Sequence, residues 1–506
     1  MVALLAYTEP ILALAFFLIL ICLFRSKNGL PWNWPLLGMF PTLLLNFHRL
    51  YELADEILEI SGGTYLLKGL WFSNMDMWLT SDPENVHYIT TTNYWNYPKG
   101  PESMQVFDTL GNSLFNLDFE EWTYYRGIVH GLFSHQKFHQ FVPKVLVDNV
   151  NEGLVPFLEE VAKQALVVDL QDMFKRHIYD AACAIATGHN PKTLSIGFEE
   201  NAFVRAMDDA CVAMLSRHIL PGRCWKLLRW LQIGSEKRLS AAKGTLRQIV
   251  TNYMATKREE LSAGAKTKED EETFDVLRMF FTINDVNDKE HPDEIVRDST
   301  IGFIFAAYDT SSATLSWLFW LLSKNPHVET KIREELDSNF SVKEGQNWQL
   351  NSRKELSKLV YLHATLCETL RLYPPVPLQS RTPVRPDILP SGHHVDSKAI
   401  VVLSGYASGR MARVWGQDCH EFKPERWINE KGDLKYERSA KFFTFNAGPR
   451  ICPGKEMAFS IMKAAAATIL YNYHVQVVET RPVTPKASII LEMKHGLRAR
   501  ISSRWT

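Results

Sequence analysis

The feature that most constrains the fold is a long, mostly apolar segment from Asp293 to Ser323. Pro292 stands where a helix can begin, and the segment stops before Lys324-Asn325-Pro326, because a residue that precedes proline avoids the α region. A helix of this length is about 45 Å long, enough to cross a whole domain. Because it is apolar nearly all round, other elements must bury it. We therefore expect one large core around this helix.

The rest of the chain predicts a mainly α-helical protein with a small β portion. A second helix is expected from Leu356 to Leu372, ending at Pro374-Pro375. Short β-like segments follow at Ile388-Leu389 and from Ala399 to Leu403. The charged residues from Lys257 to Glu272 predict an exposed loop. No Gly/Ser-rich or Pro-rich linker divides the 506 residues, which favours a single domain after the amino terminus.

Charge and cysteine usage exclude several classes of protein. Lys and Arg number 56 and Asp and Glu 57, so the formal charge is −1 and no general attraction for nucleic acid is expected. The 7 cysteines are scattered and form no C-x-x-C pair, which argues against a disulfide framework or a zinc site. His135 and His139 lie one helical turn apart, but no nearby Glu or Cys completes a metal site, so an exposed helix face is favoured.

The amino-terminal segment predicts a membrane anchor. Residues Ile11 to Phe24 are entirely apolar, and Glu9 is the only charged residue before them. From the first residue to Phe24 the stretch reaches the roughly 20 residues that a bilayer core needs. Arg25 and Lys27 follow at once, which favours a cytosolic position for the downstream chain. A cleaved signal peptide is the alternative, but no basic region precedes the apolar run and no A-x-A site follows it. Residues 1–24 are therefore expected to form a single transmembrane helix.

Residues 25–45 predict a proline-rich neck after the anchor. The motif Pro31-Trp32-Asn33-Trp34-Pro35 is followed by Gly38 and Pro41. Proline removes a backbone donor and fixes φ, so a stiff, non-helical segment is expected. The two tryptophans suit a membrane interface.

Residues Phe445 to Gly454 carry the strongest chemical signal. They read F-N-A-G-P-R-I-C-P-G and fit F-x-x-G-x-R-x-C-x-G at all the fixed positions. A chance match in such a chain is on the order of one in ten thousand. The pattern suits a cysteine thiolate on haem iron, which pushes electron density towards dioxygen and favours O–O cleavage. Gly448 permits a turn that a side chain would obstruct, and Arg450 can pair with a haem propionate. A structural cysteine beside an accidental turn is the less favoured alternative.

This decamer is the signature of the cytochrome P-450 superfamily, and the chain resembles that family over essentially its whole length. The resemblance implies a cytochrome P-450 fold preceded by a single N-terminal transmembrane helix, with residues 46–506 as the haem-binding monooxygenase domain. It implies haem b (iron protoporphyrin IX) as cofactor, with Cys452 as the iron ligand and Phe445, Gly448 and Arg450 in the haem-binding loop.

Two further motifs match the family around the haem. Glu368 and Arg371 lie on one face of the second predicted helix, where they can pair, and Arg426 of the segment FKPERW is the third member of a structural triad that the resemblance implies. Trp122 and Arg126 occupy the positions at which the family contacts the haem propionates. Phe119 stands where the family usually has glycine, so this local match is imperfect.

The segment Ala306 to Ser311, A-A-Y-D-T-S, falls in the middle of the long helix. In the resembled family this position holds an acid and a hydroxyl that handle oxygen and protons, here Asp309 and Thr310. A threonine that bonds to the carbonyl four residues earlier is the structural alternative. Ala307 replaces a usual glycine, which affects coupling and substrate shape, and Pro453 cannot donate a backbone hydrogen bond towards the sulfur.

Finer similarity points to a plant branch. PDILPSGHHV (Pro386 to Val395), VWGQDCHEFKPERW (Val414 to Trp427) and MKHGL (Met493 to Leu497) resemble the plant mid-chain alkane hydroxylases, which are close to fatty-acid ω-hydroxylases. This resemblance implies hydroxylation of a long-chain alkane or fatty acyl chain. Oxidation or oxidative phenol coupling of an aromatic alkaloid or other specialised plant metabolite is the alternative, because offshoots of the branch perform it.

The substrate-facing positions that the resemblance implies are apolar, as a hydrophobic pocket requires, although each also suits plain core packing. They are Phe107, Leu114, Phe115, Phe303, Ala306, Ala307, Val376, Leu378 and Ile490.

The sequence holds neither a G-x-G-x-x-G fingerprint nor a Walker loop, so another polypeptide is expected to supply electrons. The resemblance implies an NADPH–cytochrome reductase in the endoplasmic reticulum membrane, with the catalytic domain cytosolic and in contact with membrane lipid. Lys441, Lys455 and Arg410 can meet its acidic face, or they are simply solvated charges. A haem isomerase or dehydratase acting on a peroxide, and a non-enzymatic membrane protein, are the remaining alternatives.

Overall fold

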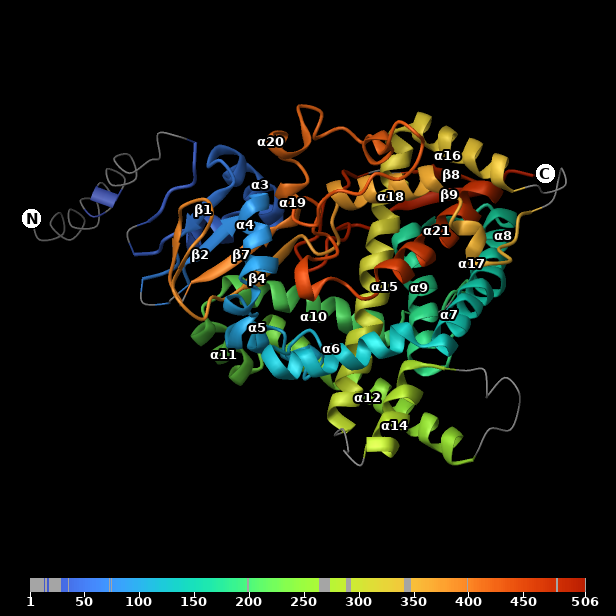
Figure 1. The fold of residues 1–506 in the computed structure, drawn as a ribbon, viewed down its shortest axis with the longest axis horizontal. Helices are drawn as coiled ribbons and strands as arrows, with labels where there is room; N and C mark the ends of the chain where they lie inside the picture. The colour runs from blue at the N-terminus through green and yellow to red at the C-terminus, as the bar shows by residue number, and fades with distance from the viewer. Residues whose placement is uncertain are drawn as a thin grey trace, which may run out of the picture.

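The computed structural model describes most of the chain after its amino terminus. The described residues are 13, 16–17, 29–34, 36–71, 73, 75–197, 200–263, 274–287, 293–340, 347–397, 399–478 and 481–505, with the backbone alone for 283–287. They form a mainly α-helical body with a smaller β region (Figure 1). This agrees with the fold class that the sequence predicts.

Helix α15, Asp293–Lys324, runs through the middle of the molecule (Figure 1). It confirms the long helix that the sequence predicts. Most of its residues are buried, because it packs against α9, Leu170–Thr187, α18, Val360–Leu372, and α21, Lys455–Asn472. The Asn325 side chain donates to the carbonyl of Leu321, and the next helix begins at Pro326. The central helix therefore ends where its sequence stops it.

The other helices surround α15. They are α2 Phe40–Leu45, α3 Leu50–Ile60, α4 Pro83–His87, α5 Gly100–Val106, α6 Phe119–Ser134, α7 Gln136–Asp148, α8 Val155–Lys163, α10 Ala202–Ile219, α11 Gly222–Leu231, α12 Gly234–Ser262, α14 Val276–Asn287, α16 Pro326–Asn339, α17 Arg353–Leu356, α19 Gly405–Ser408 and α20 Ala412–Trp415. Short 3-10 helices and π-helices join them: η1 Phe47–Arg49, η2 Tyr88–Thr92, η3 Tyr94–Asn96, η4 Asp108–Leu110, η5 Asn149–Leu154, η6 Pro424–Trp427 and η7 Gly448–Arg450.

The strands of the described residues form three small sheets. The first has the order β1-β2-β7-β4, with β1 Thr64–Leu67, β2 Met77–Thr80, β7 Ile400–Ser404 and β4 Leu378–Arg381. The second has the order β3-β9-β8, with β3 Val167–Asp169, β9 Arg498–Ser503 and β8 Tyr473–Val477. The third pairs β5 Asp387–Ile388 with β6 His394–Val395.

The first sheet lies at the amino-terminal end of the molecule (Figure 1). Within it β2 and β7 are parallel, with Met77 opposite Ile400, whereas the other pairs are antiparallel. The sequence predicted the β segments near Ile388 and from Ala399 to Leu403, and the structure has β5 and β7 there.

Two predicted boundaries were wrong. The helix expected from Leu356 to Leu372 is divided into α17 and α18, because Leu359 has a non-helical backbone and Ser352 caps α17 separately. The exposed loop expected from Lys257 to Glu272 is helical at its start, where α12 continues to Ser262. Lys257 is buried and pairs with Asp275 at 3.1 Å, so tertiary contact extends the helix into a charged sequence.

The structure tests only part of the amino-terminal predictions. The anchor predicted at 1–24 lies almost wholly outside the described residues, and none of the helices that are described is long and apolar enough to cross a bilayer. In the neck predicted at 25–45, the last six residues form α2, so the non-helical prediction was wrong there. Pro41 sits in the first turn of that helix, where a missing N–H costs nothing.

Candidate active site

The cysteine loop, residues Phe445 to Gly454, contains η7 and ends where α21 begins. A backbone hydrogen bond closes this loop: the N–H of Cys452 donates to the carbonyl oxygen of Phe445, and the nitrogen and oxygen are 2.8 Å apart. Gly448 has φ of 64°, and a Cβ there would lie 2.0 Å from the carbonyl oxygen of Thr90. A side chain at this position would therefore meet rigid backbone in a conformation that L-residues avoid. The turn predicted at Gly448 is the one that the structure has.

The sulfur of Cys452 is held against the start of α21. Burial raises the pKa of this thiol, whereas the N–H groups of Gly454 and Lys455 and the charge of Arg126 favour the thiolate. A bound metal ion would deprotonate the thiol outright. Pro453 gives no N–H to the sulfur, and the two residues after it supply these donors instead.

The structure brings Trp122 and Arg126 of α6 to the cysteine loop. Arg126 donates to the carbonyl of Ile451 at 2.6 Å. The guanidinium of Arg450 lies 4.5 Å from the centre of the Trp122 ring. Arg450 also forms an ion pair with Asp118, so its predicted propionate role competes with a carboxylate of the chain itself.

Phe119 stands where the family usually has glycine, and its backbone shows why glycine suits this position. Its φ is 53°, in the left-handed region that favours glycine. The residue is 46% exposed, so it is only about half-buried. The chain therefore keeps a glycine-like turn at a residue that is not glycine.

Two cations near this site were missed by sequence reasoning. Arg381, at the end of β4, is buried and donates to the carbonyl of Ser380. Burial lowers the pKa of Lys99 to about 7, with the charges of Arg450 and Arg381 adding to the effect. Burial likewise lowers the pKa of Arg381 to about 10. No local motif marks Lys99 or Arg381, because their neighbours come from distant segments.

The carboxylate that faces these cations is Asp118. Below the pKa of about 7, Lys99 is protonated, and Lys99, Arg381 and Arg450 then carry three positive charges against the one negative charge of Asp118, which leaves a surplus of two. Buried charge needs a partner of opposite sign. A ligand with two carboxylates on one edge would neutralise this surplus.

The predicted structural triad is assembled on α18 and η6. Arg371 donates to both oxygens of Glu368, at 2.8 and 2.7 Å, and the nearest atoms of Arg426 and Glu368 are 3.5 Å apart. Trp427 donates to Glu368 at 2.8 Å. Thr444, which directly precedes the cysteine loop, donates to the carbonyl of Leu370 at 3.2 Å. The triad thus stabilises α18, the helix to which the start of the cysteine loop is hydrogen-bonded.

One face of α15, called the accessible face below, carries residues that are only partly buried although the helix runs through the middle of the molecule. It carries Phe303, Ala306, Ala307 and Thr310, at the spacing of one helix face, while Ile304, Phe305, Tyr308 and Asp309 between them are buried. Thr310 donates to the carbonyl of Ala306 at 2.7 Å, as the structural alternative predicts. Its oxygen still has a lone pair that can accept a hydrogen bond.

Asp309 does not share the accessible face of Thr310. It is 1% exposed and accepts a weak bond from the Cys211 thiol at 3.7 Å. Its carboxyl belongs to a cluster with Asp208 and Glu492. The structure therefore separates the two residues that the sequence placed together in oxygen chemistry.

The predicted substrate positions lie in three groups. Phe107 packs edge-on against His218 at 5.4 Å, and Phe115 packs edge-on against Phe305 at 6.4 Å, beside Leu114. Val376 and Leu378 follow α18, and the N–H of Leu491, next to Ile490, donates to the carbonyl of Pro375. Ile490 is fully buried, as plain core packing requires. The third group is the accessible face of α15.

Comparison with known proteins agrees with this geometry. A family model of cytochrome P-450 matches residues 29–496. The chain belongs to the cytochrome P-450 family. It is 39% identical over 500 residues to alkane hydroxylase MAH1 of Arabidopsis thaliana, which covers 97% of this chain and 98% of that protein.

A second relative carries a different activity in its name. The chain is 37% identical over 506 residues to noroxomaritidine synthase 2 of Narcissus pseudonarcissus, covering 98% of this chain and 97% of that protein. It is also 36% identical over 506 residues to cytochrome P-450 86B1 of Arabidopsis thaliana, covering 98% and 90%. The protein is thus a cytochrome P-450 monooxygenase whose relatives bear the names of both a hydroxylase and a synthase.

The residues of this cytochrome P-450 fit the haem of its family. Cys452 offers the sulfur ligand, and the surplus of two positive charges at Lys99, Arg381 and Arg450 suits the two propionates of haem. Trp122 lies beside this cationic group. The fit rests on charge and on donor chemistry at residues from several distant segments.

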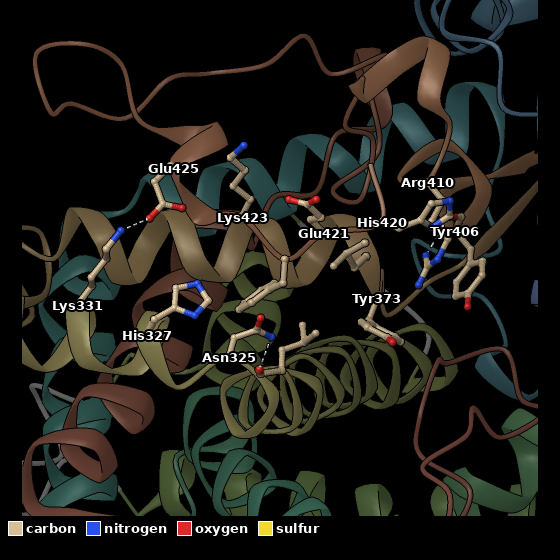
Figure 2. Close-up of a pocket in the computed structure, with 13 residues that line it drawn as sticks. Asn325, His327, Lys331, Tyr373, Tyr406, Arg410, His420, Glu421, Lys423 and Glu425 are labelled. Atoms are coloured by element: carbon tan, nitrogen blue, oxygen red, sulfur yellow. Dashed lines mark hydrogen bonds and ion pairs between the residues drawn. The ribbon is translucent and has the colours of Figure 1, made fainter. Parts of the chain in front are cut away.

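A separate hollow lies on the surface at the carboxyl end of α15 (Figure 2). It has a volume of about 750 Å³ and is lined by polar side chains, among them His327, Lys423 and Arg410. The Arg410 guanidinium stacks 3.6 Å from the ring centre of Tyr406. Of the residues predicted for reductase docking, Arg410 alone lines this hollow.

Proposed function

We propose that this monooxygenase hydroxylates a long aliphatic chain, either an alkane or a fatty acyl chain. The observation that carries the proposal is the accessible face of α15, where Phe303, Ala306 and Ala307 precede Thr310. These side chains offer an apolar surface and no charge. A chain of methylene groups can pack on such a surface and needs no hydrogen-bond partner.

The position of the Asp309 carboxyl supports the same class of substrate. An alkaloid amine is cationic near neutral pH, and burying it requires an anionic partner. Asp309 is the acid nearest to Thr310 along α15, but its carboxyl oxygens lie within 4.8 Å of those of Asp208 and Glu492. The identity of 39% with an alkane hydroxylase is consistent with this substrate class.

Oxidative phenol coupling of an aromatic alkaloid is the second candidate. The observation in its favour is the identity of 37% with noroxomaritidine synthase 2. Ala307 adds a methyl group on the accessible face, which gives an aromatic ring a surface for packing.

Product analysis separates the two candidates. Microsomes that contain the full chain and an NADPH reductase are incubated with a long-chain alkane, a fatty acid and a bisphenolic amine. We expect alcohols from the aliphatic substrates and no coupled product from the amine. Turnover of the bisphenolic amine alone would reject the aliphatic proposal.

The chemistry needs haem, which supplies oxygen activation when its iron is bound by a thiolate. The chain contributes the rest. Cys452 provides the thiolate, held by the N–H groups of Gly454 and Lys455. The oxygen of Thr310 can accept a hydrogen bond and so hold a water on the accessible face of α15. The apolar side chains beside it exclude further water from the reacting carbon.

Replacing Cys452 tests the class of site. Cys452→Ala is expected to abolish the Soret band of the reduced carbon monoxide complex and all turnover. Cys367→Ala, which removes a buried thiol from α18, is the matched control and is expected to keep both. A thiolate spectrum in Cys452→Ala would overturn the assignment.

The electrons are proposed to come from NADPH through a membrane-bound NADPH–cytochrome reductase. Lys441 and Lys455 lie beside the cysteine loop, over the rings of Trp415 and Phe445. Opposite charges on a partner speed association in a salt-dependent way.

Charge replacement tests this docking site. Changing Lys441, Lys455 and Arg410 to Glu is expected to slow reduction, with the largest effect at low salt. Lys163, Lys192 and Lys237, which are exposed on other segments, give a control with the same change of charge. Equal reduction rates in the two triple variants would reject the docking site.

We also propose a location in the endoplasmic reticulum membrane, with one spanning segment and a cytosolic catalytic domain. Large apolar side chains are exposed near the amino-terminal end: Leu45 is 77% exposed on α2, and Trp230 is 78% exposed on α11. Helices α2 and α10 are in contact, and α11 follows α10 directly. Such exposed apolar surface is typical of a contact with lipid.

Microsome fractionation tests the location. The full chain is expected to resist carbonate extraction, and the part after residue 45 is expected to be digested by protease added outside sealed microsomes. Protection of that part would reject the cytosolic orientation, and extraction by carbonate would reject the spanning segment.

A further inference from the structure

The surface hollow at the carboxyl end of α15 has the size of a ligand site. Its volume is about 750 Å³, within the range of about 300–1,000 Å³ that small-molecule sites occupy. In the view of Figure 2, Arg410 and Tyr406 lie towards one end of the hollow, and Lys331 lies towards the other. Among the described residues that line it, none belongs to the cysteine loop, so the hollow is separate from the candidate active site.

Arg410 is held in a fixed position at its end of the hollow. Its guanidinium lies 3.6 Å from the ring centre of Tyr406 and 5.1 Å from that of Tyr373. One of its nitrogens also donates to the carbonyl of Tyr406 at 3.1 Å. A guanidinium that aromatic rings already hold in place loses little further side-chain freedom when it binds a ligand. The arginine is therefore oriented for binding before a ligand arrives.

One of the two rings beside Arg410 is itself anchored to the central helix. Tyr373 stacks on Trp317 of α15, with 3.9 Å between the ring centres and 9° between the ring planes. The indole of Trp317 donates to the carbonyl of Leu491 at 2.7 Å, and Trp317 is fully buried. Because a displacement of Trp317 would disrupt the core, Tyr373 gives Arg410 a rigid platform.

Arg410 differs from the lysines of the hollow, because it forms no ion pair with a carboxylate among the described residues. Lys331 pairs with Glu425 at 2.6 Å, and Lys423 pairs with Asp418 at 3.1 Å. The Arg410 side chain makes one hydrogen bond in the described part of the chain, to a carbonyl, although a guanidinium has five N–H groups. Its remaining N–H groups can therefore bind a carboxylate through two parallel hydrogen bonds.

Asp55 of α3 is the acid on which the charge of Arg410 acts. Burial raises the pKa of this carboxyl to about 6, and the charge of Arg410 opposes the rise without cancelling it. A carboxylate that is paired closely with a guanidinium has its pKa lowered instead. Asp55 therefore does not neutralise Arg410, whose charge remains available to a ligand.

The charge of the lining favours a ligand with a single negative charge. Three positive and two negative side chains line the hollow, which leaves a surplus of one positive charge when the histidines are neutral. They are Lys331, Arg410, Lys423, Glu421 and Glu425. A multiply charged anion would be repelled by the two carboxylates, whereas a monoanion balances the surplus.

The hollow also offers apolar surface beside Arg410. Leu321 of α15, Leu372 of α18 and Phe422 line it together with the two tyrosine rings. An apolar body gains free energy when such a surface removes it from water, and one charged contact fixes its orientation. The lining therefore suits a carboxylate that carries an aromatic or aliphatic body.

We propose that this hollow is a second binding site of the protein, and that its ligand is a monocarboxylate with an apolar body, bound by Arg410. Aromatic acids and fatty acids share this chemistry. Neither Cys452 nor Thr310 lines the hollow, so the inference does not depend on the substrate of the monooxygenase.

Fluorine NMR of the haem-loaded full chain in lipid nanodiscs tests the site, with para-fluorobenzoate as the probe. The fluorine signal is expected to shift and broaden as protein is added, while the haem absorption stays unchanged because the probe binds away from the iron. The alcohol para-fluorobenzyl alcohol has the same ring and no charge, and it is expected to bind about tenfold more weakly, since a charged hydrogen bond is lost. Equal binding of the two compounds would overturn the proposal.

Arg410→Gln is expected to lower the affinity for para-fluorobenzoate about tenfold, and Arg410→Lys is expected to keep part of it, because lysine retains the charge but lacks the planar fork. Arg413→Gln is the matched control, since Arg413 pairs with Asp82 at 3.2 Å and does not line the hollow. It is expected to bind the probe as the wild type does. Equal affinities in Arg410→Gln and Arg413→Gln would overturn the proposal.

Glu421→Gln gives a second measurement, which keeps the test decisive if Arg410→Gln folds poorly. Glu421 is exposed on the lining of the hollow, so its replacement leaves the core intact. The loss of its negative charge raises the surplus to two positive charges, and the affinity for para-fluorobenzoate is expected to rise about threefold. An unchanged or weaker affinity would overturn the proposal.

Competition experiments identify the class of acid. Decanoate and phenylacetate are added to the complex with para-fluorobenzoate, and the compound that displaces the probe at the lower concentration assigns a fatty acid or an aromatic acid. Displacement by neither compound would overturn the proposal. A failure of the monooxygenase function is distinct, because a missing thiolate spectrum would remove that function, whereas a normal thiolate spectrum without binding of the probe would remove this inference alone.

Discussion

Two buried charge clusters hold different parts of this enzyme, and they differ in how fully their hydrogen bonds are made. In the Glu368 cluster, Glu368 accepts from Arg371, Trp427 and the N–H of Lys423, and Arg371 also donates to backbone carbonyls. In the Asp309 cluster, Oδ1 of Asp309 and the hydroxyl of Tyr308 lack partners among the described residues.

This difference indicates which of the two clusters can change its protonation state. A buried ion pair with all its hydrogen bonds made has one favourable arrangement, so it fixes the fold. The Asp309 cluster holds three carboxyl groups, of Asp208, Asp309 and Glu492, but two lysines, Lys175 and Lys486, so one carboxyl in excess binds a proton and can lose it again. We therefore assign the Glu368 cluster to structure, whereas the Asp309 cluster can change its protonation state.

The largest expected effect comes from breaking the satisfied cluster. Arg371→Ala leaves the buried Glu368 with Arg426, 3.5 Å away, as its remaining cationic partner, and should cost about 3–5 kcal/mol in the free energy of unfolding. Expression yield, haem content and urea unfolding measure this loss. A loss below about 1 kcal/mol would show that this cluster does not hold the fold.

A smaller loss is expected from Trp427→Phe. The indole donates to Glu368 at 2.8 Å, and phenylalanine keeps the ring but lacks the donor. An unsatisfied bond at a buried acid costs about 1–3 kcal/mol, which urea unfolding can measure. Trp505→Phe is the matched control, because the indole of Trp505, near the carboxyl terminus, donates to the backbone carbonyl of Tyr471 and not to an acid. Equal losses in both variants would contradict the special role of Glu368.

The third effect depends on pH and concerns the Asp309 cluster. The folded state raises the pKa of Asp309, so folding binds a proton more tightly and stability falls as pH rises above the ordinary value of 3.8. An amide side chain cannot ionise, so the stability of Asp309→Asn relative to the wild type should increase between about pH 5 and about pH 8. Unfolding at several pH values measures this trend, and a pH-independent difference would argue against a protonated Asp309.

Glu492 should produce the opposite trend at low pH. The folded state lowers its pKa to about 2 from the ordinary 4.5, so its contribution is present above 4.5 and is lost as pH falls towards 2. Acid unfolding of Glu492→Gln is therefore expected to depend less on pH in this range than that of the wild type.

The smallest effect is expected at the surface, where Lys331 pairs with Glu425 at 2.6 Å (Figure 2). Both side chains are more than 40% exposed, so Lys331→Ala should change stability by about 0–1 kcal/mol. The change should shrink further at high salt. A loss as large as that of Arg371→Ala would show that burial does not separate these pairs.

Much of the fold followed from local sequence signals. The apolar run and the proline after it predicted α15 almost to its last residue, because periodicity and a following proline act within a few residues. The division between α17 and α18 was missed, since Ser352 and Leu359 act there through capping and backbone geometry that the apolar pattern hides. The end of α12 was missed because the partner that buries Lys257 is Asp275, beyond a charged stretch.

The sequence by itself determined the cysteine loop, the central helix and the Glu368 pair, because each depends on residues that are close in the chain. Only the tertiary structure decided that Lys99 and Arg381 join Arg450, and that Asp309 faces Glu492 rather than Thr310. The physical reason is that a buried charge is set by its neighbours in space. Those neighbours come from segments that only the folded chain brings together.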